Sequence, residues 1–272
     1  NINHFATQGS SGGPVGMINV NFIREVDLYS GAFPANRGNS LSSVMEFKQI
    51  DGNPDRIAKT LTIGSSDIGA TLDGPINDKT TFVLSARRSY LQLLFSAIGL
   101  PFLPTYNDFQ FKTKTKLNDK NQITVIGIGA IDDFELNTGA NDNEDDPDVI
   151  ERNNYILGYL PVTTQWNYAT GINWTHFKDN SFQNFILSRN HLNNESVKYK
   201  DNIKEGQNLL QNYKSEEIET KFRFENTIRN NGWKINFGTG LEAVTYKNKT
   251  YQKIIFQNVE DTLNFNSELN FI

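Results

Sequence analysis

Apolar and polar residues alternate along most of this 272-residue chain, and the alternation predicts its secondary structure. In the stretch 109–117, aromatic residues and threonines alternate with Gln110, Lys112, Lys114 and Lys116. Successive side chains of a β-strand point to opposite faces of the sheet, so a period of two is typical of a strand between two different environments. We therefore expect strands with one apolar face and one charged face.

The same period appears in residues 221–229, where Phe222 and Phe224 lie on the face opposite to Arg223 and Arg229. Several such runs are longer than about ten residues, whereas strands of globular proteins centre near five or six. A strand that crosses a bilayer needs about 9–11 residues. Strand length therefore favours a membrane barrel.

Short polar turns and long polar loops follow each other along the chain after residue 56. The short turns are Asn77-Asp78-Lys79, Asn118-Asp119-Lys120-Asn121, Lys178-Asp179-Asn180 and Asn230-Asn231-Gly232. Asn, Asp and Gly tolerate the positive φ that tight hairpins require. The long loops are expected near residues 91–106, 133–156, 200–213 and 250–261. Short turns at one end of the strands and long loops at the other are typical of an outer-membrane barrel.

The first part of the chain has a different, loop-rich character. A Gly/Ser-rich turn at 9–14 precedes strand-like runs at 18–29 and 41–50, and the turn residues 51–54 close the region. We therefore predict a small compact unit over residues 1–55 and a strand-rich unit over residues 56–272.

Composition excludes several classes of protein. The net charge of -5 is modest and the basic residues form no stripe, which argues against nucleic acid as a partner. Cysteine is absent, so disulfides and thiolate metal sites are excluded. No stretch reaches the roughly 18 apolar residues of a membrane-spanning helix. The chain opens with Asn1 and stops at Ile272 inside a strand-like run, and we expect it to be a piece of a longer protein.

Candidate catalytic and metal-binding residues are few. His4, His176 and His191 are far apart and have no metal-ligand spacing, so each is expected at a lumen or loop position. The sequence has no nucleophile elbow or phosphate-binding loop, and Gly127-Ile128-Gly129 is interpreted as a place in a strand where bulk is excluded. We therefore predict no enzyme activity, no cofactor and no resident metal.

The acidic run at residues 141–151 has two interpretations. Its carboxylates offer the oxygen ligands that hard cations such as Ca²⁺ prefer, but it lacks the Gly and the terminal Glu of an EF-hand loop. A solvated surface loop is the favoured interpretation, and cation binding stays open.

The segment 25–44 (EVDLYSGAFPANRGNSLSSV) resembles the closing part of the plug domain of TonB-dependent outer-membrane receptors, in the type common in Bacteroidetes. In that type a strand, a Gly-Gly/Ala-Phe-Pro-Ala turn, a Gly and a Leu-Ser-Ser-Val strand follow in this order. Asn36, Arg37 and Asn39 depart from the family pattern, which has Arg, Tyr and Gly there.

The segments 69–76 and 85–90 resemble the first barrel hairpin of the same family. The resemblance implies a 22-stranded barrel closed by an N-terminal plug, which imports scarce nutrients with energy delivered through TonB. We count about nine strands here. The expected fold is therefore all-β: a partial transmembrane antiparallel β-barrel, preceded by the C-terminal part of a plug domain.

The resemblance also implies a location, partners and site residues. The location is the bacterial outer membrane, and the partners are its lipid, TonB through a missing N-terminal segment, and an unidentified imported ligand, with a surface lipoprotein as a further candidate. Residues of the plug gate are expected to include Arg24, Glu25, Tyr29 and Arg37. Charges that face the barrel lumen, to pair with the plug or an anionic ligand or to be hydrated, are expected to be Lys112, Lys114, Lys116, Arg223 and Arg229.

Two other classes of protein are compatible with the alternation of apolar and polar residues. A soluble β-sandwich-like binding module, such as a carbohydrate-binding one, would pack its apolar strand faces against each other. An outer-membrane barrel enzyme would need a Ser/His or paired-acid constellation on adjacent strands, and the sequence gives no sign of one.

Overall fold

The computed structural model of the chain describes residues 3–5, 15–31, 33–34, 36–37, 43–256 and 259–272. The predicted turn at 9–14 and much of the family-like segment at 31–43 lie outside the described residues. The described residues before 56, called the N-terminal segment below, form two small antiparallel sheets and a 3-10 turn. Their elements are β1 (Asn3–His4), β2 (Val15–Gly16), η1 (Val20–Phe22), β3 (Ile23–Tyr29) and β4 (Val44–Gln49).

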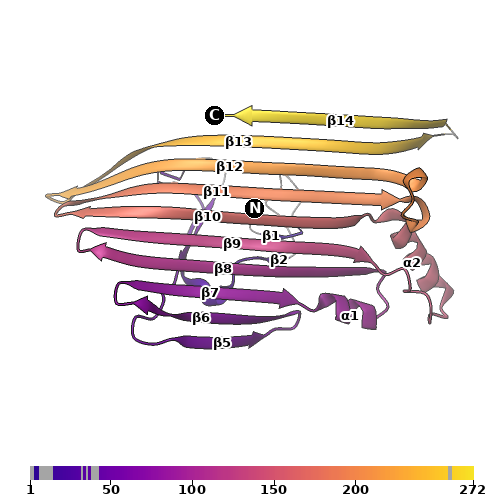
Figure 1. Cartoon of the computed structure of the whole chain (residues 1–272), viewed down its shortest axis with the longest axis horizontal. Helices are drawn as coiled ribbons and strands as arrows, with labels where there is room; N and C mark the ends of the chain where they lie inside the picture. Colours follow the sequence, from indigo (N-terminus) through magenta and orange to yellow (C-terminus); the bar gives the residue numbers. More distant parts are fainter. Residues whose placement is uncertain (1–2, 6–14, 32, 35, 38–42, 257–258) are drawn as a thin grey trace.

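A ten-stranded antiparallel sheet follows, in which neighbours in sequence are neighbours in space (Figure 1). The sequence suggested about nine strands, close to this count. The strands are β5 (Ala58–Ile63), β6 (Asp67–Asn77), β7 (Thr80–Ser89), β8 (Phe102–Asn118), β9 (Asn121–Leu136), β10 (Val162–Lys178), β11 (Ser181–Tyr199), β12 (Leu209–Asn230), β13 (Trp233–Phe256) and β14 (Val259–Phe271).

The four predicted short turns join strands at one end of this sheet, as expected. The opposite end carries the longer connections, with α1 (Leu91–Ala97), α2 (Pro147–Tyr159), η2 (Lys200–Asn202) and η3 (Gly206–Asn208). The loop predicted at 250–261 is wrong, because β13 and β14 stay paired as far as Phe256 and Val259. Polar residues on both faces of a strand resemble a loop in sequence, yet the backbone ladder continues through them.

The acidic run at 141–151 ends in a helix that the sequence did not predict. Asp146 caps the start of α2, where its side chain accepts a hydrogen bond from the backbone N–H of Asp148 at 2.9 Å. Pro147 occupies the first helical turn, where a missing backbone N–H costs nothing. Part of the acidic run therefore stabilises a helix start.

Cross-strand register divides the side chains of the sheet into two faces. One row runs Ile172, Leu187, Phe222 and Leu241 across β10–β13, and these side chains are 40–69% exposed. We call this the outer face. The adjacent row continues it with stacked rings of Trp174 and Phe185, whose centroids lie 5.0 Å apart.

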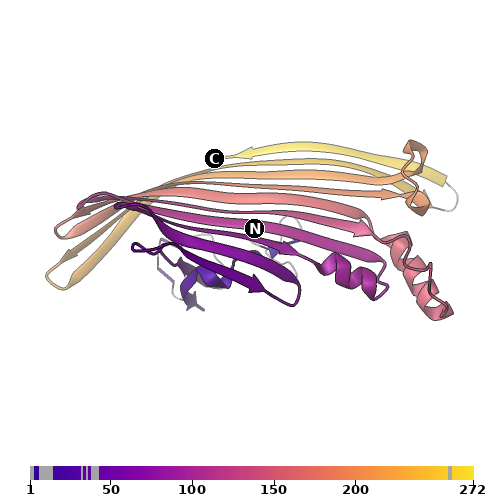
Figure 2. The same cartoon turned by 60° about the horizontal axis from the view of Figure 1, so that its bottom comes forward.

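The other face, called the inner face, is polar and carries the N-terminal segment. In Figure 2 this segment, drawn in indigo, lies against one side of the curved sheet. Beneath it, the fully buried side chains of the sheet include Ser85, Gln110 and Asp132. In the described part of the chain, no helix is long and apolar enough to cross a membrane.

Two strand glycines show how tightly the outer face is filled. A Cβ atom at Gly127 would lie 2.3 Å from the ring of Phe111, and one at Gly129 would lie 2.6 Å from the ring of Phe109. The aromatic rings of β8 therefore cover the glycines of β9, and the interpretation that bulk is excluded there is confirmed.

Candidate functional site

The candidate site is the seam between the N-terminal segment and the inner face of β7–β9. Arg87 and Gln110 hold the main chain of the segment at this seam. The Arg87 Nη2 donates to the Gly16 carbonyl at 2.8 Å, and the Gln110 Nε2 donates to the Met17 carbonyl at 2.6 Å. Met17 and Gln110 are both fully buried. The bond to Gly16 is exposed, whereas the bond to Met17 satisfies a carbonyl group that has been removed from water, as buried backbone requires.

Asn19 adds a side-chain contact from the start of η1. Its Nδ2 donates to the Ser85 hydroxyl at 2.8 Å, and its Oδ1 accepts from the Asn21 backbone N–H at 2.9 Å. Ser85 in turn accepts a hydrogen bond from Thr71 on β6. The turn at η1 is thereby fixed to two strands of the sheet.

Asp108 is the centre of a buried charge cluster at the seam. Its Oδ2 accepts from the Arg87 Nε at 2.8 Å, and the same oxygen lies 3.0 Å from the His4 Nε2. The His4 Nδ1 lies 2.5 Å from Asp132 Oδ1 on the neighbouring strand β9. Burial acts to lower the pKa of His4, but the hydrogen bonds to Asp108 and Asp132 outweigh it and raise the pKa above its usual value.

A second contact cluster binds the end of the N-terminal segment. The Lys112 Nζ donates to the carbonyls of Gln49 and Ile50 at 3.0 Å each and lies 2.7 Å from Asp51 Oδ1. Lys114 reaches the other oxygen of Asp51 at 2.6 Å. Two lysines from β8 therefore share one carboxylate of the segment.

The five predicted lumen-facing charges lie in different surroundings. Lys112 and Lys114 contact the N-terminal segment as described above. Lys116 is exposed and pairs with Asp119 in the adjacent turn at 2.9 Å, and Arg223 pairs with Glu225 on its own strand at 3.1 Å. Arg229 is exposed near the β12–β13 turn. The structure brings the first two together and leaves the others apart, and the proposed roles of all five stay predictions.

The four residues expected in the plug gate lie on the N-terminal segment. Arg24, Glu25 and Tyr29 are on β3, and Glu25 pairs with Lys48 of β4 at 3.1 Å. Arg37 forms an ion pair with Glu46 at 2.8 Å. These contacts join parts of the segment to each other, and the gate role stays a prediction.

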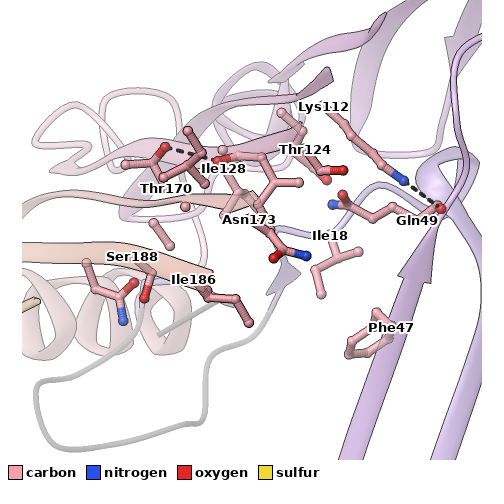
Figure 3. A pocket seen from close by; sticks show the side chains of 17 residues that line it. Ile18, Phe47, Gln49, Lys112, Thr124, Ile128, Thr170, Asn173, Ile186 and Ser188 are labelled. Atoms are coloured by element: carbon pink, nitrogen blue, oxygen red, sulfur yellow. Dashed lines mark hydrogen bonds between the residues drawn. The ribbon is translucent and has the colours of Figure 1, made fainter. Parts of the chain in front are cut away.

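A cavity of about 460 Å³ lies between the segment and the sheet (Figure 3). Ile18, Phe47 and Gln49 line it from the segment, opposite inner-face residues such as Ile128 and Ile186. Its lining is mainly apolar, with Lys112 at one edge, where the dashed line to Gln49 marks its hydrogen bond.

Two histidines have surroundings that the sequence did not indicate. His4 was expected at an ordinary lumen or loop position, but its carboxylate partners lie 104 and 128 residues away. No spacing rule finds contacts at that separation. His191 lies on the outer face, where its ring packs edge-on against Trp166 with centroids 4.5 Å apart. In the described residues, no three His, Asp or Glu side chains are arranged to hold a metal ion.

Comparison with known proteins identifies the fold. The chain is similar to the ferripyoverdine receptor of the outer membrane of Pseudomonas aeruginosa, with a TM-score of 0.59 and 13% identity over 88% of this chain and 34% of that one. It is also similar to a G324V mutant of the ferric enterobactin receptor of the same organism, with a TM-score of 0.58 and 11% identity over 87% of this chain and 38% of that one. The structure of the FpvAI–pyocin S2 complex gives a TM-score of 0.57 at 13% identity, over 92% of this chain and 36% of that one.

No family model matches the chain, and no curated protein matches it. At identities this low the likeness establishes the fold alone, and the chain spans about a third of the length of each receptor. The fold that the chain shares with these structures is all-β, a partial antiparallel barrel. These neighbours are receptors and not enzymes.

Proposed function

We propose that the chain is the end of the plug and the first ten strands of a TonB-dependent receptor, of the Bacteroidetes type, in a bacterial outer membrane. The receptor takes up a scarce nutrient, such as a siderophore or an oligosaccharide, with energy from TonB. In this proposal residues 1–55 belong to the plug and residues 56–272 to the barrel. TonB would bind a plug segment that precedes this chain, and a surface lipoprotein is a further candidate partner.

One observation carries the membrane part of this proposal. The outer face exposes rows of large apolar side chains, such as Leu187 and Leu241, while the inner face buries Asp108, Gln110 and Asp132. A soluble β-sandwich does the reverse, because it packs its apolar strand faces against each other. Apolar-out and polar-in is the arrangement of a barrel in lipid.

The end of the sheet that carries the longer connections supports a role in ligand capture. Helix α2 is fixed there by Lys198, whose Nζ donates to the carbonyls of Leu157 at 2.6 Å and Leu160 at 2.9 Å. Asn202 also donates to the Leu157 carbonyl. Cations and donors at the C-terminus of a helix satisfy its free carbonyls. A helix held in this way presents a defined surface, which includes Tyr155 and Tyr159, to the outside.

Two measurements test the proposal on the full-length protein in its own bacterium. Membrane fractionation and gel mobility with and without boiling are expected to place it in the outer membrane as a folded barrel. Uptake of ⁵⁵Fe-loaded siderophores and of labelled oligosaccharides is then compared between intact cells, cells in which the gene for this protein is deleted, and TonB-deficient cells. A soluble location would refute the proposal. So would a result in which neither deletion of the gene nor loss of TonB changes the uptake of any tested compound.

The gate assignment is tested by substitutions in the same cells. Replacement of Arg37 by Ala removes its ion pair with Glu46 and is expected to change uptake without loss of the barrel from the membrane. Replacement of Asp119 by Ala is the control, because that side chain is 95% exposed in a turn and has no assigned role in the gate or lumen. Equal effects of the two substitutions would argue against the gate.

A further inference from the structure

His4 lies between two carboxylates in a fully buried position. Its Nε2 is 3.0 Å from Asp108 Oδ2, and its Nδ1 is 2.5 Å from Asp132 Oδ1. A neutral imidazole has one N–H, and an ionised carboxylate can only accept hydrogen bonds. Two short contacts of this kind therefore need one proton more than a neutral histidine with two carboxylates provides. The geometry itself requires the cluster to hold an extra proton.

The other charged groups around His4 make this proton important for charge balance. From β7, Arg87 donates to Asp108 Oδ2 through Nε, and its Nη2 forms an ion pair with the same oxygen at 2.7 Å. From β8, the Tyr106 ring stacks on the imidazole at 4.2 Å, and its hydroxyl donates to Asp67. Two carboxylates on His4 are then balanced by one guanidinium and one imidazolium. Loss of the proton leaves an uncompensated negative charge in a buried site, which is strongly unfavourable.

The cluster also holds the strand that contains His4. Asp132 accepts the Phe5 backbone N–H at 2.8 Å, and His4 is paired with Val15 in the β1–β2 sheet. Arg87, which binds Asp108, also donates to the Gly16 carbonyl. If His4 leaves, Asp108 loses one of its partners. Asp108 then holds Arg87 less firmly in its position beside the Gly16 carbonyl of β2. The proton and the docking of both strands are therefore coupled.

We propose that His4, Asp108 and Asp132 form a proton-operated latch, in which the docked β1–β2 strands bind a proton that they release when they leave the sheet. The latch is closed by acid and opened by alkali. Any displacement of this segment at neutral pH is accompanied by release of a proton. This inference concerns docking alone and stands whether or not the protein transports a nutrient.

The direction of the pH effect follows from the raised pKa of docked His4. The undocked histidine has the ordinary pKa of 6.5. Docking is therefore strongest below that pH and weakens as the pH rises through the higher pKa of the docked form. For one linked proton the docking equilibrium changes by at most about tenfold per pH unit.

A buried thiol reports opening of the latch. The chain has no cysteine, and Met17 is fully buried at the seam, so a Met17→Cys variant of the full-length protein is labelled by an uncharged maleimide when the segment leaves. An Asp119→Cys variant, in an exposed turn, corrects for the pH dependence of the thiol itself. Between pH 5.5 and 9 we expect the corrected labelling rate to rise, by up to about tenfold per unit.

Two further substitutions, each made in the Met17→Cys background, separate the latch from general loosening. Asp132→Asn can donate to a neutral imidazole and still accept from Phe5, so protection should persist at alkaline pH without the slope. His4→Gln should be labelled faster at low pH and also lose the slope. Gel mobility without boiling confirms that each variant keeps its barrel. A flat profile for the Met17→Cys protein, or an unchanged slope in the His4→Gln variant, would overturn the latch.

Discussion

The ten-stranded sheet has a near half, β5–β9, and a far half, β10–β14. The two halves use charged inner-face residues in different ways. In the near half, Arg87, Asp108 and Lys112 contact the N-terminal segment and are largely or fully buried. In the far half, Lys221 pairs with Glu219 of its own strand at 2.8 Å and with Glu242 of the next strand at 3.3 Å. The same alternation of charged and apolar residues therefore produces docking contacts in one half and pairs within the sheet in the other.

Burial, and not charge alone, therefore decides how much a residue contributes to docking of the N-terminal segment. A cation that is removed from water must be compensated, so its loss or the loss of its partner is costly. An exposed pair contributes little, because water and salt already solvate both groups. Four predictions test this contrast between the halves, beginning with the largest effect.

Replacement of Asp108 by Ala should weaken docking of the N-terminal segment most. It leaves Arg87 and His4 without their shared carboxylate, and breaking a buried pair in this way costs about 3–5 kcal/mol. Hydrogen exchange of residues 15–17 in the full-length protein measures the loss of protection. Arg223→Ala is the control from the far half, since that side chain is 44% exposed and should leave this exchange unchanged. Equal exchange in the two variants would contradict the contrast.

Replacement of Lys112 by Met should have the next largest effect. Lys112 is 11% exposed and binds two carbonyls and Asp51, and hydrogen bonds that involve a charged group contribute about 1.5–3 kcal/mol. Protection of residues 47–51 from hydrogen exchange is the measurement. Lys116→Met, on the same face of the same strand, should show no measurable change. If Lys116→Met exposed the segment as much, burial would not be the deciding factor.

Acid should loosen the Asp51 contact. Burial acts to raise the pKa of Asp51, but its hydrogen bonds to Lys112 and Lys114 outweigh this and lower the pKa below its ordinary 3.8. This contribution to docking is present above pH 3.8 and is lost as the pH falls through the lower pKa of the docked form. Exchange of residues 47–51 should therefore increase below about pH 3.8, while Asp51→Asn should remove this acid dependence. A profile that is the same with and without Asp51 would exclude it as the cause.

Replacement of Asn36 by Ala should have the smallest effect. Its Nδ2 donates to Glu225 of β12, in the far half, at 3.3 Å and in an exposed position. Surface substitutions of this kind change stability by less than about 0.5 kcal/mol. Denaturation of the detergent-solubilised protein provides the check. A loss as large as that of Lys112→Met would mean that the far half also holds the segment.

The alternation of residues was enough to predict the two faces of the sheet. The stretch 109–117 placed Lys112 and Lys114 opposite Phe109, and the register confirms that they lie on different faces. The short turns were found for a similar reason, since Asn, Asp and Gly act locally on the backbone. Arg87 and Arg88 are adjacent on one strand and therefore face opposite ways, which their separate partners, Asp108 and Asn107, show.

The partners of these residues could not be predicted. Asp51 contacts Lys112 and Lys114, which lie 61 and 63 positions later in the sequence. His4 contacts Asp132, which lies 128 positions later. Such contacts depend on how the N-terminal segment lies on the sheet, which no local pattern specifies. The helices α1 and α2 were missed because a short helix in a polar or apolar loop has no long period to reveal it.

The hydrogen bonds from the sheet to main-chain carbonyls have a consequence for how the sequence of such a protein can change during evolution. Arg87, Gln110 and Lys112 bind the carbonyls of residues 16, 17, 49 and 50, and every amino acid carries that group. Side chains at those four positions can therefore drift without loss of these bonds, provided that the backbone path is kept. N-terminal segments of different sequence can therefore dock on the same inner face. Recombination between related chains can exchange this part of the molecule.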